Sequence, residues 1–199
     1  MPKTGTHSVR QALREQLDVA DLEQVGLFVN KRFPWEHLAA IRHGHLSLRQ
    51  VRPYLGDEAF DNYFKFAFVR NPFDRFISYC AFMLRNGDAF QQQPREAMRY
   101  FLFGEPPEHH ILFQSQASLL LGDDGKTLLT NMVGHVEDMQ ASYDEICARI
   151  GVPSRPLDRV NESRHGDYRH YYDQALIDGV AARYSQDLDL FGYTFEGMR

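Results

Sequence analysis

The hydrophobic pattern changes its period within the most apolar stretch of the chain. Residues 63–69 are dense in aromatic and β-branched side chains and are interrupted only by Lys65, as is typical of a strand buried on both faces. Beyond them, Asn71 can cap a helix and Pro72 suits its first position. The apolar residues then recur at helical spacing, at Phe76, Ile77, Cys80, Met83 and Leu84. This stretch therefore predicts a central strand that leads directly into a helix.

The rest of the chain alternates in the same way between short apolar runs and helical spacing. The predicted elements are strands at 25–30 and 128–133, and helices after Ser8, after Ser47, within 90–103, over 139–150 and from about Asp173. Strands that alternate with helices favour an α/β fold. We therefore expect one domain over residues 1–199, with a mostly parallel central sheet flanked by helices.

The charge balance narrows the classes of partner. The net charge is −5 and the isoelectric point is near 6.0, whereas proteins that bind nucleic acid or membrane surfaces generally rely on a basic field. We therefore expect no nucleic-acid partner. The sequence shows no leading apolar segment of the signal-peptide type and no run of about 18 apolar residues that could span a bilayer, which favours a cytoplasmic protein. Cys80 and Cys147 fall on apolar faces of predicted helices, so we expect core residues rather than a disulfide or a metal site.

The junction between the central strand and its helix is suited to a phosphate. Arg70 stands at the carboxyl end of the strand, where open α/β sheets bind ligands. Ser78 lies about 9 Å further along the helix, from a rise of about 1.5 Å per residue. A fixed cation and a hydroxyl within reach of one another can hold one phosphate group. The alternative interpretation is a surface ion pair at Arg70 and a solvated Ser78.

The first eight residues form a second candidate site for an anion. Lys3, Gly5 and several hydroxyl residues precede a helix whose apolar face begins at Val9. The free N–H groups and the dipole of a helix N-terminus attract phosphate, Gly5 permits close approach, and Lys3 adds a point charge. The spacing of a Walker A loop is absent, which disfavours an ordinary nucleoside triphosphatase. The alternative is an exposed polar segment that binds no ligand.

The two segments together resemble a known family. The segment Pro2-Lys-Thr-Gly-Thr-His-Ser8 resembles the 5'-phosphosulfate loop of sulfotransferases that use PAPS, 3'-phosphoadenosine 5'-phosphosulfate. The segment from Arg70 to Tyr79 resembles the 3'-phosphate motif of the same enzymes. The phrase Tyr63-Phe-Lys-Phe-Ala-Phe-Val-Arg-Asn-Pro is similar to the carbohydrate sulfotransferase branch. The resemblance implies a P-loop-like three-layer fold, PAPS as co-substrate, no metal, and a carbohydrate acceptor.

The resemblance also implies roles for particular residues. His45 begins a segment similar to the one that carries the catalytic histidine of glycan sulfotransferases, and His43 with His45 is similar to the paired histidines of uronosyl 2-O-sulfotransferases. We therefore expect His45 to act as general base with His43 assisting, a role common for imidazole because its reference pKa is about 6.5. We expect Lys3 to neutralise charge on the bridging oxygen of the donor. The expected donor-binding residues are Lys3, Thr4, Gly5, Thr6, His7, Ser8, Arg70, Ser78 and Ser163.

Some polar residues further along the chain are weaker candidates. Gln114 and Gln116, with His109 and His110, could contact hydroxyl groups of a sugar, because binding residues are often carried by loops. Glu137 resembles the acidic residue that follows a strand in the family, and we expect it to have an orienting or structural role.

Other interpretations stay open from the sequence. In the family a central strand precedes the phosphosulfate loop, whereas only two residues precede Lys3 here, so either the recorded start is late or the sheet lacks this strand. Without support from a strand the loop could fray, and the protein could then bind the nucleotide without catalysis. A P-loop-type phosphotransferase would need magnesium and prefer ATP, but the missing Walker A spacing speaks against it. At single positions, His43, His45 and Ser163 could be ordinary polar loop residues.

Overall fold

The described part of the chain is rich in helices. The structure is a computed structural model, and it describes residues 1–18, 21, 35–41, 45–104, 110–158 and 166–199. The α-helices are α1 (Thr6–Arg14), α2 (Glu36–Ala39), α3 (Leu48–Leu55), α4 (Asp57–Asn62), α5 (Pro72–Met83), α6 (Ala89–Gln92), α7 (Pro94–Phe103), α8 (Ala117–Leu120), α9 (Met139–Ile150), α10 (Gln174–Arg183) and α11 (Ser185–Phe191). The 3₁₀ helices are η1 (Val136–Asp138) and η2 (Tyr168–Tyr171), and the strands are β1 (Phe66–Val69), β2 (Met132–His135), β3 (Tyr193–Thr194) and β4 (Gly197–Met198).

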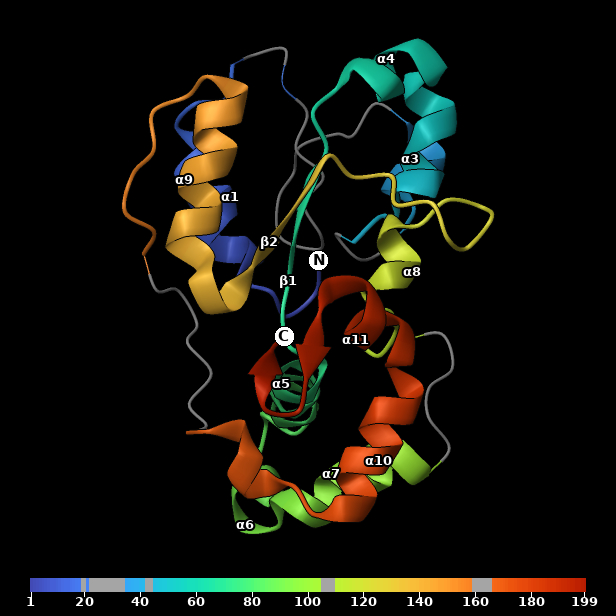
Figure 1. The fold of residues 1–199 in the computed structure, drawn as a ribbon, viewed down its shortest axis with the longest axis vertical. Coiled ribbons are helices and arrows are strands. Elements are labelled where there is room, and N and C mark those ends of the chain that lie inside the picture. The colour runs from blue at the N-terminus through green and yellow to red at the C-terminus, as the bar shows by residue number, and fades with distance from the viewer. Residues whose placement is uncertain (19–20, 22–34, 42–44, 105–109, 159–165) are drawn as a thin grey trace.

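A parallel pair of strands, β1 and β2, lies at the centre of the molecule (Figure 1). Phe66 pairs with Met132 and Val69 pairs with His135. Because the strands are parallel, their carboxyl ends meet at one edge of the sheet, the edge at which α/β folds bind ligands. β3 and β4 form a separate antiparallel hairpin near the end of the chain.

Helices pack on both faces of the parallel pair, because successive side chains of a strand point to opposite faces. Phe66 and Phe68 join apolar residues of α1 and α9 in one cluster. Ala67 and Val69 join apolar residues of α8, α11 and the hairpin in another. This helix-rich arrangement around a small parallel sheet agrees with the predicted α/β class, while the P-loop-like three-layer description stays a prediction.

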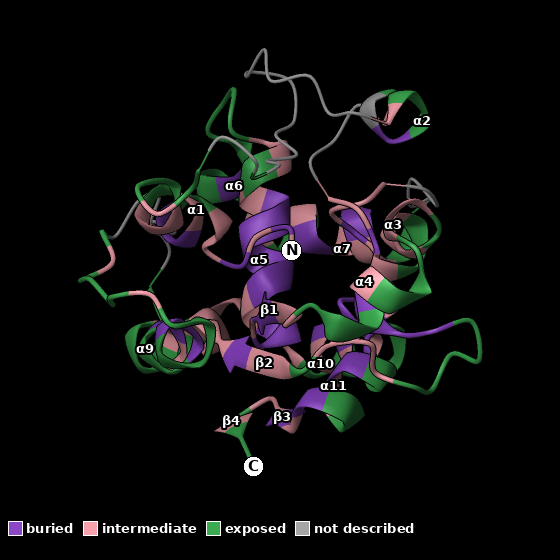
Figure 2. Ribbon diagram, turned by 90° about the horizontal axis from the view of Figure 1, so that it is seen from above, coloured by how far each residue is buried: buried purple, intermediate pink, exposed green. Residues whose placement is uncertain are grey.

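Helix α5 begins as the sequence predicted. The side chain of Asn71 accepts a hydrogen bond from the N–H of Phe73 at 3.0 Å, and Pro72 occupies the first helical position. Apolar side chains of α5 pack against α7, α10 and η2 in a cluster rich in aromatic rings. Figure 2 shows α5 coloured as buried along most of its length. The interior position of α5 fixes the place of Arg70, which directly precedes the cap.

The strands have different limits from those expected. β1 begins at Phe66 rather than at Tyr63, because α4 occupies the preceding segment and Tyr63 is 59% exposed. β2 begins at Met132, and Leu128 forms an isolated bridge outside the strand. The strand expected at 25–30 lies outside the described residues.

Several local predictions are confirmed. Ser47 caps α3 in a reciprocal capping box with Gln50, and Gly151 ends α9 with a positive φ of 74°. Cys80 and Cys147 are free thiols buried in the core.

Across the described ranges, we find no helix that combines the length and the apolar character needed to cross a membrane.

Candidate functional site

The loop before α1 is held by hydrogen bonds within its own first residues. The hydroxyl groups of Thr4 and Thr6 both donate to the carbonyl oxygen of Met1, at 3.1 and 2.5 Å. Thr4 is only 1% exposed. A helix leaves the N–H groups of its first turn without intrahelical partners, which suits an anion, but the N–H of Ser8 already donates to the carbonyl of Gly5 at 3.0 Å. The backbone N–H of Ser8, one of the expected phosphate donors, is therefore already engaged within the loop.

Gly5 is the position where this loop most needs glycine. Its φ is 65°, a conformation that side chains with a Cβ rarely adopt. A Cβ added there would lie 2.4 Å from Cε of Met139, at the start of α9. The loop is thus packed closely against the helix that follows β2.

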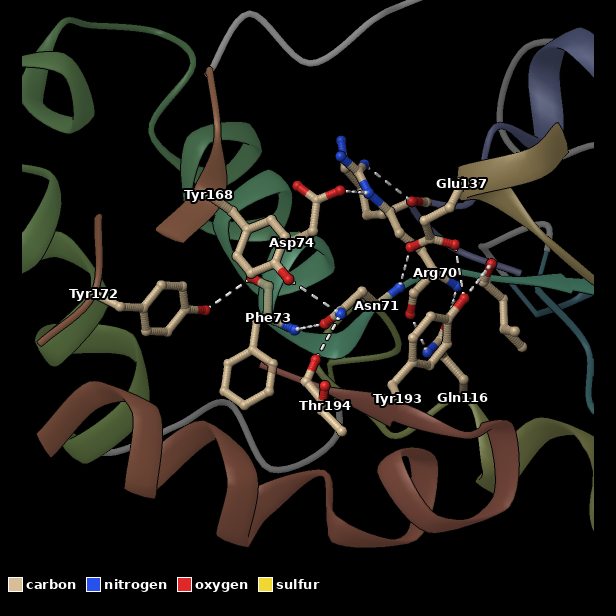
Figure 3. Close-up of polar contacts among 12 residues, drawn as sticks. Arg70, Asn71, Phe73, Asp74, Gln116, Glu137, Tyr168, Tyr172, Tyr193 and Thr194 are labelled. Atoms are coloured by element: carbon tan, nitrogen blue, oxygen red, sulfur yellow. Dashed lines mark hydrogen bonds and ion pairs between the residues drawn. The ribbon is translucent and has the colours of Figure 1, made fainter. Parts of the chain in front are cut away.

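The backbone of Arg70 is held on both sides by one buried side chain. The N–H of Arg70 donates to Oε1 of Gln116, and Nε2 of Gln116 donates to the carbonyl of Arg70, both at 2.9 Å (Figure 3). Gln116 is fully buried, and its own N–H donates to Asp187 at 2.8 Å. The expectation that Gln116 contacts a sugar is therefore corrected: the residue fixes the turn at Arg70.

The two candidate phosphate turns meet in the structure. Nη1 of Arg70 donates to the carbonyl oxygen of Lys3 at 3.5 Å, although the residues are 67 positions apart. Nε of Arg70 also donates to Oδ2 of Asp74 at 2.7 Å, and both of these side chains are mostly shielded from solvent. The structure therefore brings together the two segments that the sequence singled out separately.

Cationic groups gather around the Lys3 side chain. Its ammonium lies 4.6 Å from the centre of the Phe82 ring, and the guanidinium of Arg85 lies 4.1 Å from the centre of the same ring. Burial, followed by the charges of Arg70 and Arg85, lowers the pKa of Lys3 to about 8. A group of like charges held together in an acidic protein is a favourable place for a multiply charged anion.

His7 extends this group of cations along α1. Its side chain is exposed, and its Nδ1 lies 3.3 Å from Nη2 of Arg10. Partial burial lowers the pKa of His7, followed by the charges of Arg10 and Lys3. At neutral pH this keeps His7 mainly uncharged in the absence of an anion.

Ser78 follows Arg70 by two turns of α5, as expected, but it is only 5% exposed. A phosphate that bonded its hydroxyl would have to enter between α5 and the side chains that cover it. Arg70 is the more accessible partner of this expected pair, at 13% side-chain exposure.

The segment of His45 lies against the same apolar cluster as the two turns. Leu48, three residues beyond His45, and Met1, which is close to Lys3 in sequence, both pack against the cluster that contains Val69, the residue before Arg70. His45 is half-buried, and its Nδ1 is shielded from solvent. His43, His109 and Ser163 lie outside the described residues.

A cavity of about 380 Å³ adjoins the start of α3. Its wall is formed by Ser47, Arg49, Gln50, Ile111, Gln114, Ser118, Leu119 and Asp123. Arg49 and Asp123 form an ion pair at 3.6 Å, so their charges offset one another. Gln114 belongs to this wall, in keeping with its candidacy for binding an acceptor.

Sequence reasoning missed two of the site's structural partners. Asp74 follows Arg70 at a spacing of four, a pattern that commonly predicts an ion pair on a helix. No sequence pattern indicated Arg85, because it comes near Lys3 only through the Phe82 ring, which both residues contact. Glu137 accepts a hydrogen bond from the N–H of Asn71 at 2.7 Å, a contact that an orienting residue would make.

Comparison with known protein families gives a match. A sequence model of the sulfotransferase family matches residues 29–194, so it includes Arg70 and begins after the Lys3 loop. No curated protein and no solved structure matches the chain.

Proposed function

Because this chain belongs to the sulfotransferase family, we propose that it transfers a sulfuryl group from PAPS to a hydroxyl group of a carbohydrate. The observation that carries this proposal is the contact between the Lys3 loop and the Arg70 turn. A donor with a phosphosulfate at one end and a 3'-phosphate at the other requires two anion sites close together. ATP lacks the 3'-phosphate, so the second site gives selectivity for PAPS.

At the donor end, the proposed roles follow from charge and position. Lys3 lies at the loop and would neutralise the bridging oxygen between sulfur and the 5'-phosphate as charge develops there. The first-turn N–H groups of α1 other than that of Ser8 would bind the 5'-phosphate. Arg70, assisted by Ser78, would bind the 3'-phosphate through its guanidinium. Ser163 keeps the role that family resemblance implies, closing over the nucleotide.

At the acceptor end, His45 is the proposed general base, with His43 assisting. The acceptor oxygen would attack sulfur in line with the bridging oxygen. The new S–O bond would form as the bond to the bridging oxygen breaks, and 3'-phosphoadenosine 5'-phosphate (PAP) would leave with the electron pair. The acceptor's proton would pass to His45. Most of the rate enhancement would come from positioning and from charge stabilisation.

The cavity beside Ser47 supports a carbohydrate acceptor. Its described wall carries hydroxyl and amide groups, from Ser47, Gln50, Gln114 and Ser118, together with two apolar side chains. Such groups can donate to and accept from sugar hydroxyls. The cavity starts two residues from His45, so an acceptor bound there would present a hydroxyl near the proposed base.

The direct test is transfer of labelled sulfate from PAPS to a panel of glycans. We expect the full chain to transfer sulfate. The transfer rate should fall at least a hundredfold in His45→Ala, Lys3→Ala and Arg70→Ala, since each substitution removes a group from the reacting centre or from the donor site. Arg149→Ala is the matched control, because Arg149 is exposed on α9 and pairs with Glu145 in its own helix.

The outcomes separate the proposed function from its alternatives. Tight binding of PAP without transfer to any glycan would instead support a nucleotide-binding module. Magnesium-dependent transfer from ATP would support a phosphotransferase. Full activity of all three site variants would show that the assigned roles are wrong.

A further inference from the structure

The hydroxyl of Tyr193 occupies the centre of a buried polar network beside the Arg70 turn. Tyr193 belongs to the hairpin strand β3 and is 1% exposed. Its hydroxyl lies 2.7 Å from Oε2 of Glu137 and 2.8 Å from Nδ1 of His135. A longer contact of 3.4 Å reaches the carbonyl of Val69, the last residue of β1.

The single proton of the Tyr193 hydroxyl decides which group donates and which accepts in each hydrogen bond of this network. A tyrosine hydroxyl has one proton to donate, and a carboxylate at 2.7 Å is a stronger acceptor than a neutral imidazole. Burial, followed by the charge of Glu137, raises the pKa of Tyr193, so the hydroxyl keeps that proton. The proton therefore points to Glu137, and Nδ1 of His135 must carry the hydrogen of the other bond. His135 is thereby assigned the Nδ1–H tautomer.

The chain of bonds ends on the residue next to Arg70. The N–H of Asn71 donates to Oε1 of Glu137 at 2.7 Å. The side-chain amide of Asn71 also donates to the carbonyl of Thr194, the hairpin residue after Tyr193, at 2.9 Å. Figure 3 shows the side chain of Asn71 between Glu137 and the hairpin. Both the backbone and the side chain of Asn71 are thus tied to segments far along the chain.

We infer that Tyr193 and Glu137 are positioning residues, which act through a directed chain of hydrogen bonds from His135 to hold the Arg70 turn in the geometry that binds a 3'-phosphate. The inference rests on the proposed function. Gln116 fixes the backbone of Arg70, and Glu137 fixes the amide of the following residue. The C-terminal hairpin therefore belongs to the donor site without touching the donor.

Binding of two nucleotides tests this role. We expect Tyr193→Phe to weaken binding of PAP about tenfold, because one hydrogen bond to a charged group is lost. The affinity for adenosine 5'-phosphate should change by no more than about twofold, because the Lys3 loop binds the 5'-phosphate. Tyr184→Phe is the matched control. Tyr184 is also buried, at 3% exposure, and its hydroxyl donates to the carbonyl of Phe113 at 3.0 Å.

The nucleotide affinities are measured by calorimetry, and the outcomes distinguish the inference from the proposed function on which it rests. If the unaltered protein fails to bind PAP, the proposed function falls and takes the inference with it. If the unaltered protein binds PAP and Tyr193→Phe binds it equally well, only the inference is overturned. Equal losses for both nucleotides would also overturn it, since they would indicate general destabilisation.

Nitrogen NMR of the imidazole rings provides a second test that does not require a folded Tyr193 variant. We expect neutral His135 of the unaltered protein to carry its hydrogen on Nδ1. Glu137→Gln places an amide donor near the tyrosine, so the Tyr193 proton should turn toward Nδ1 and the hydrogen of His135 should move to Nε2. An Nε2–H tautomer in the unaltered protein, or no change in Glu137→Gln, would overturn the directed chain.

Discussion

The side chain of Gln116 completes the hydrogen bonding of both backbone groups of Arg70, at 2.9 Å each. An arginine that binds a ligand at the end of a strand needs a backbone that stays in place when the ligand binds its side chain. Here both backbone polar groups of Arg70 are satisfied by one buried amide. Gln116 in turn is held by Asp187, which connects the site to α11.

Replacement of Gln116 tests this brace. We expect Gln116→Leu to lower the free energy of unfolding by about 2 to 4 kcal/mol, because buried polar groups of Arg70 lose their partners at about 1 to 3 kcal/mol each. Chemical denaturation measures the change. Gln92→Leu is the control: Gln92 is exposed on α6, where its side chain bonds Asp88 of the same segment, so its effect should stay within about 0.5 kcal/mol. Similar losses in both variants would contradict the role of Gln116.

Asp74 should have opposite effects on stability and on donor binding. Its carboxylate pairs with Arg70 at 2.7 Å, where its charge would repel a 3'-phosphate. We expect Asp74→Asn to strengthen PAP binding about three- to tenfold, since the amide keeps an acceptor oxygen but removes the repelling charge. The same change should cost about 0.5 to 1 kcal/mol of stability, because an acidic residue in the first turn favours the helix. Calorimetry and thermal denaturation give the two values.

The control for Asp74 is an acidic residue of another helix. Asp178→Asn removes an exposed charge on α10 that bonds Gln174 and should leave PAP affinity unchanged. If Asp74→Asn weakened PAP binding, Asp74 would have to be a residue that orients Arg70 rather than one that competes with the phosphate.

PAP binding should become weaker as the pH rises above about 8. The pKa of Lys3 is about 8, chiefly because of burial, and a bound phosphate would raise it by favouring the ammonium form. Below that pH Lys3 is already charged, so binding takes up no proton there. Above it, binding must take up a proton, and affinity should fall by up to about tenfold per pH unit until the pKa of the complex is reached.

Calorimetry in buffers of different ionisation enthalpy measures this proton uptake directly. Lys3→Arg is the informative variant, because a guanidinium stays charged throughout this range and should bind PAP without the dependence. Proton uptake at pH 8.5 that persists in Lys3→Arg would assign the titration to another group.

Gly5 should tolerate alanine less well than a glycine of the same backbone conformation elsewhere. Gly151 has a φ of 74° with no atom within 4 Å of an added Cβ, whereas a Cβ at Gly5 meets Met139. Both substitutions should cost about 1 kcal/mol for the backbone alone. Gly5→Ala should additionally weaken PAP binding by about tenfold, because the loop must shift away from α9 to relieve the contact. Equal PAP affinity in the two variants, measured by calorimetry, would show that the loop does not bind the nucleotide.

The sequence by itself determined the features that depend on neighbours along the chain. Asn71 and Pro72 start α5, Ser47 starts α3 and Gly151 ends α9, since caps and turns are decided by backbone conformation within a few residues. The burial of Cys80 and Cys147 followed from helical spacing, because both lie on the apolar faces of their helices. The candidate anion turns near Lys3 and Arg70 were also visible locally, because cations, glycine and hydroxyl groups at an element's end are short-range signals.

Only the tertiary structure decided how these parts are joined. The contact of Arg70 with Lys3, the brace from Gln116 and the bond between Glu137 and Tyr193 connect residues separated by 46 to 67 positions. No local pattern distinguishes a glutamine that binds a sugar from one that holds a backbone, because the same amide can do either. The choice depends on which groups burial leaves without water, and that is set by the packing of the whole chain.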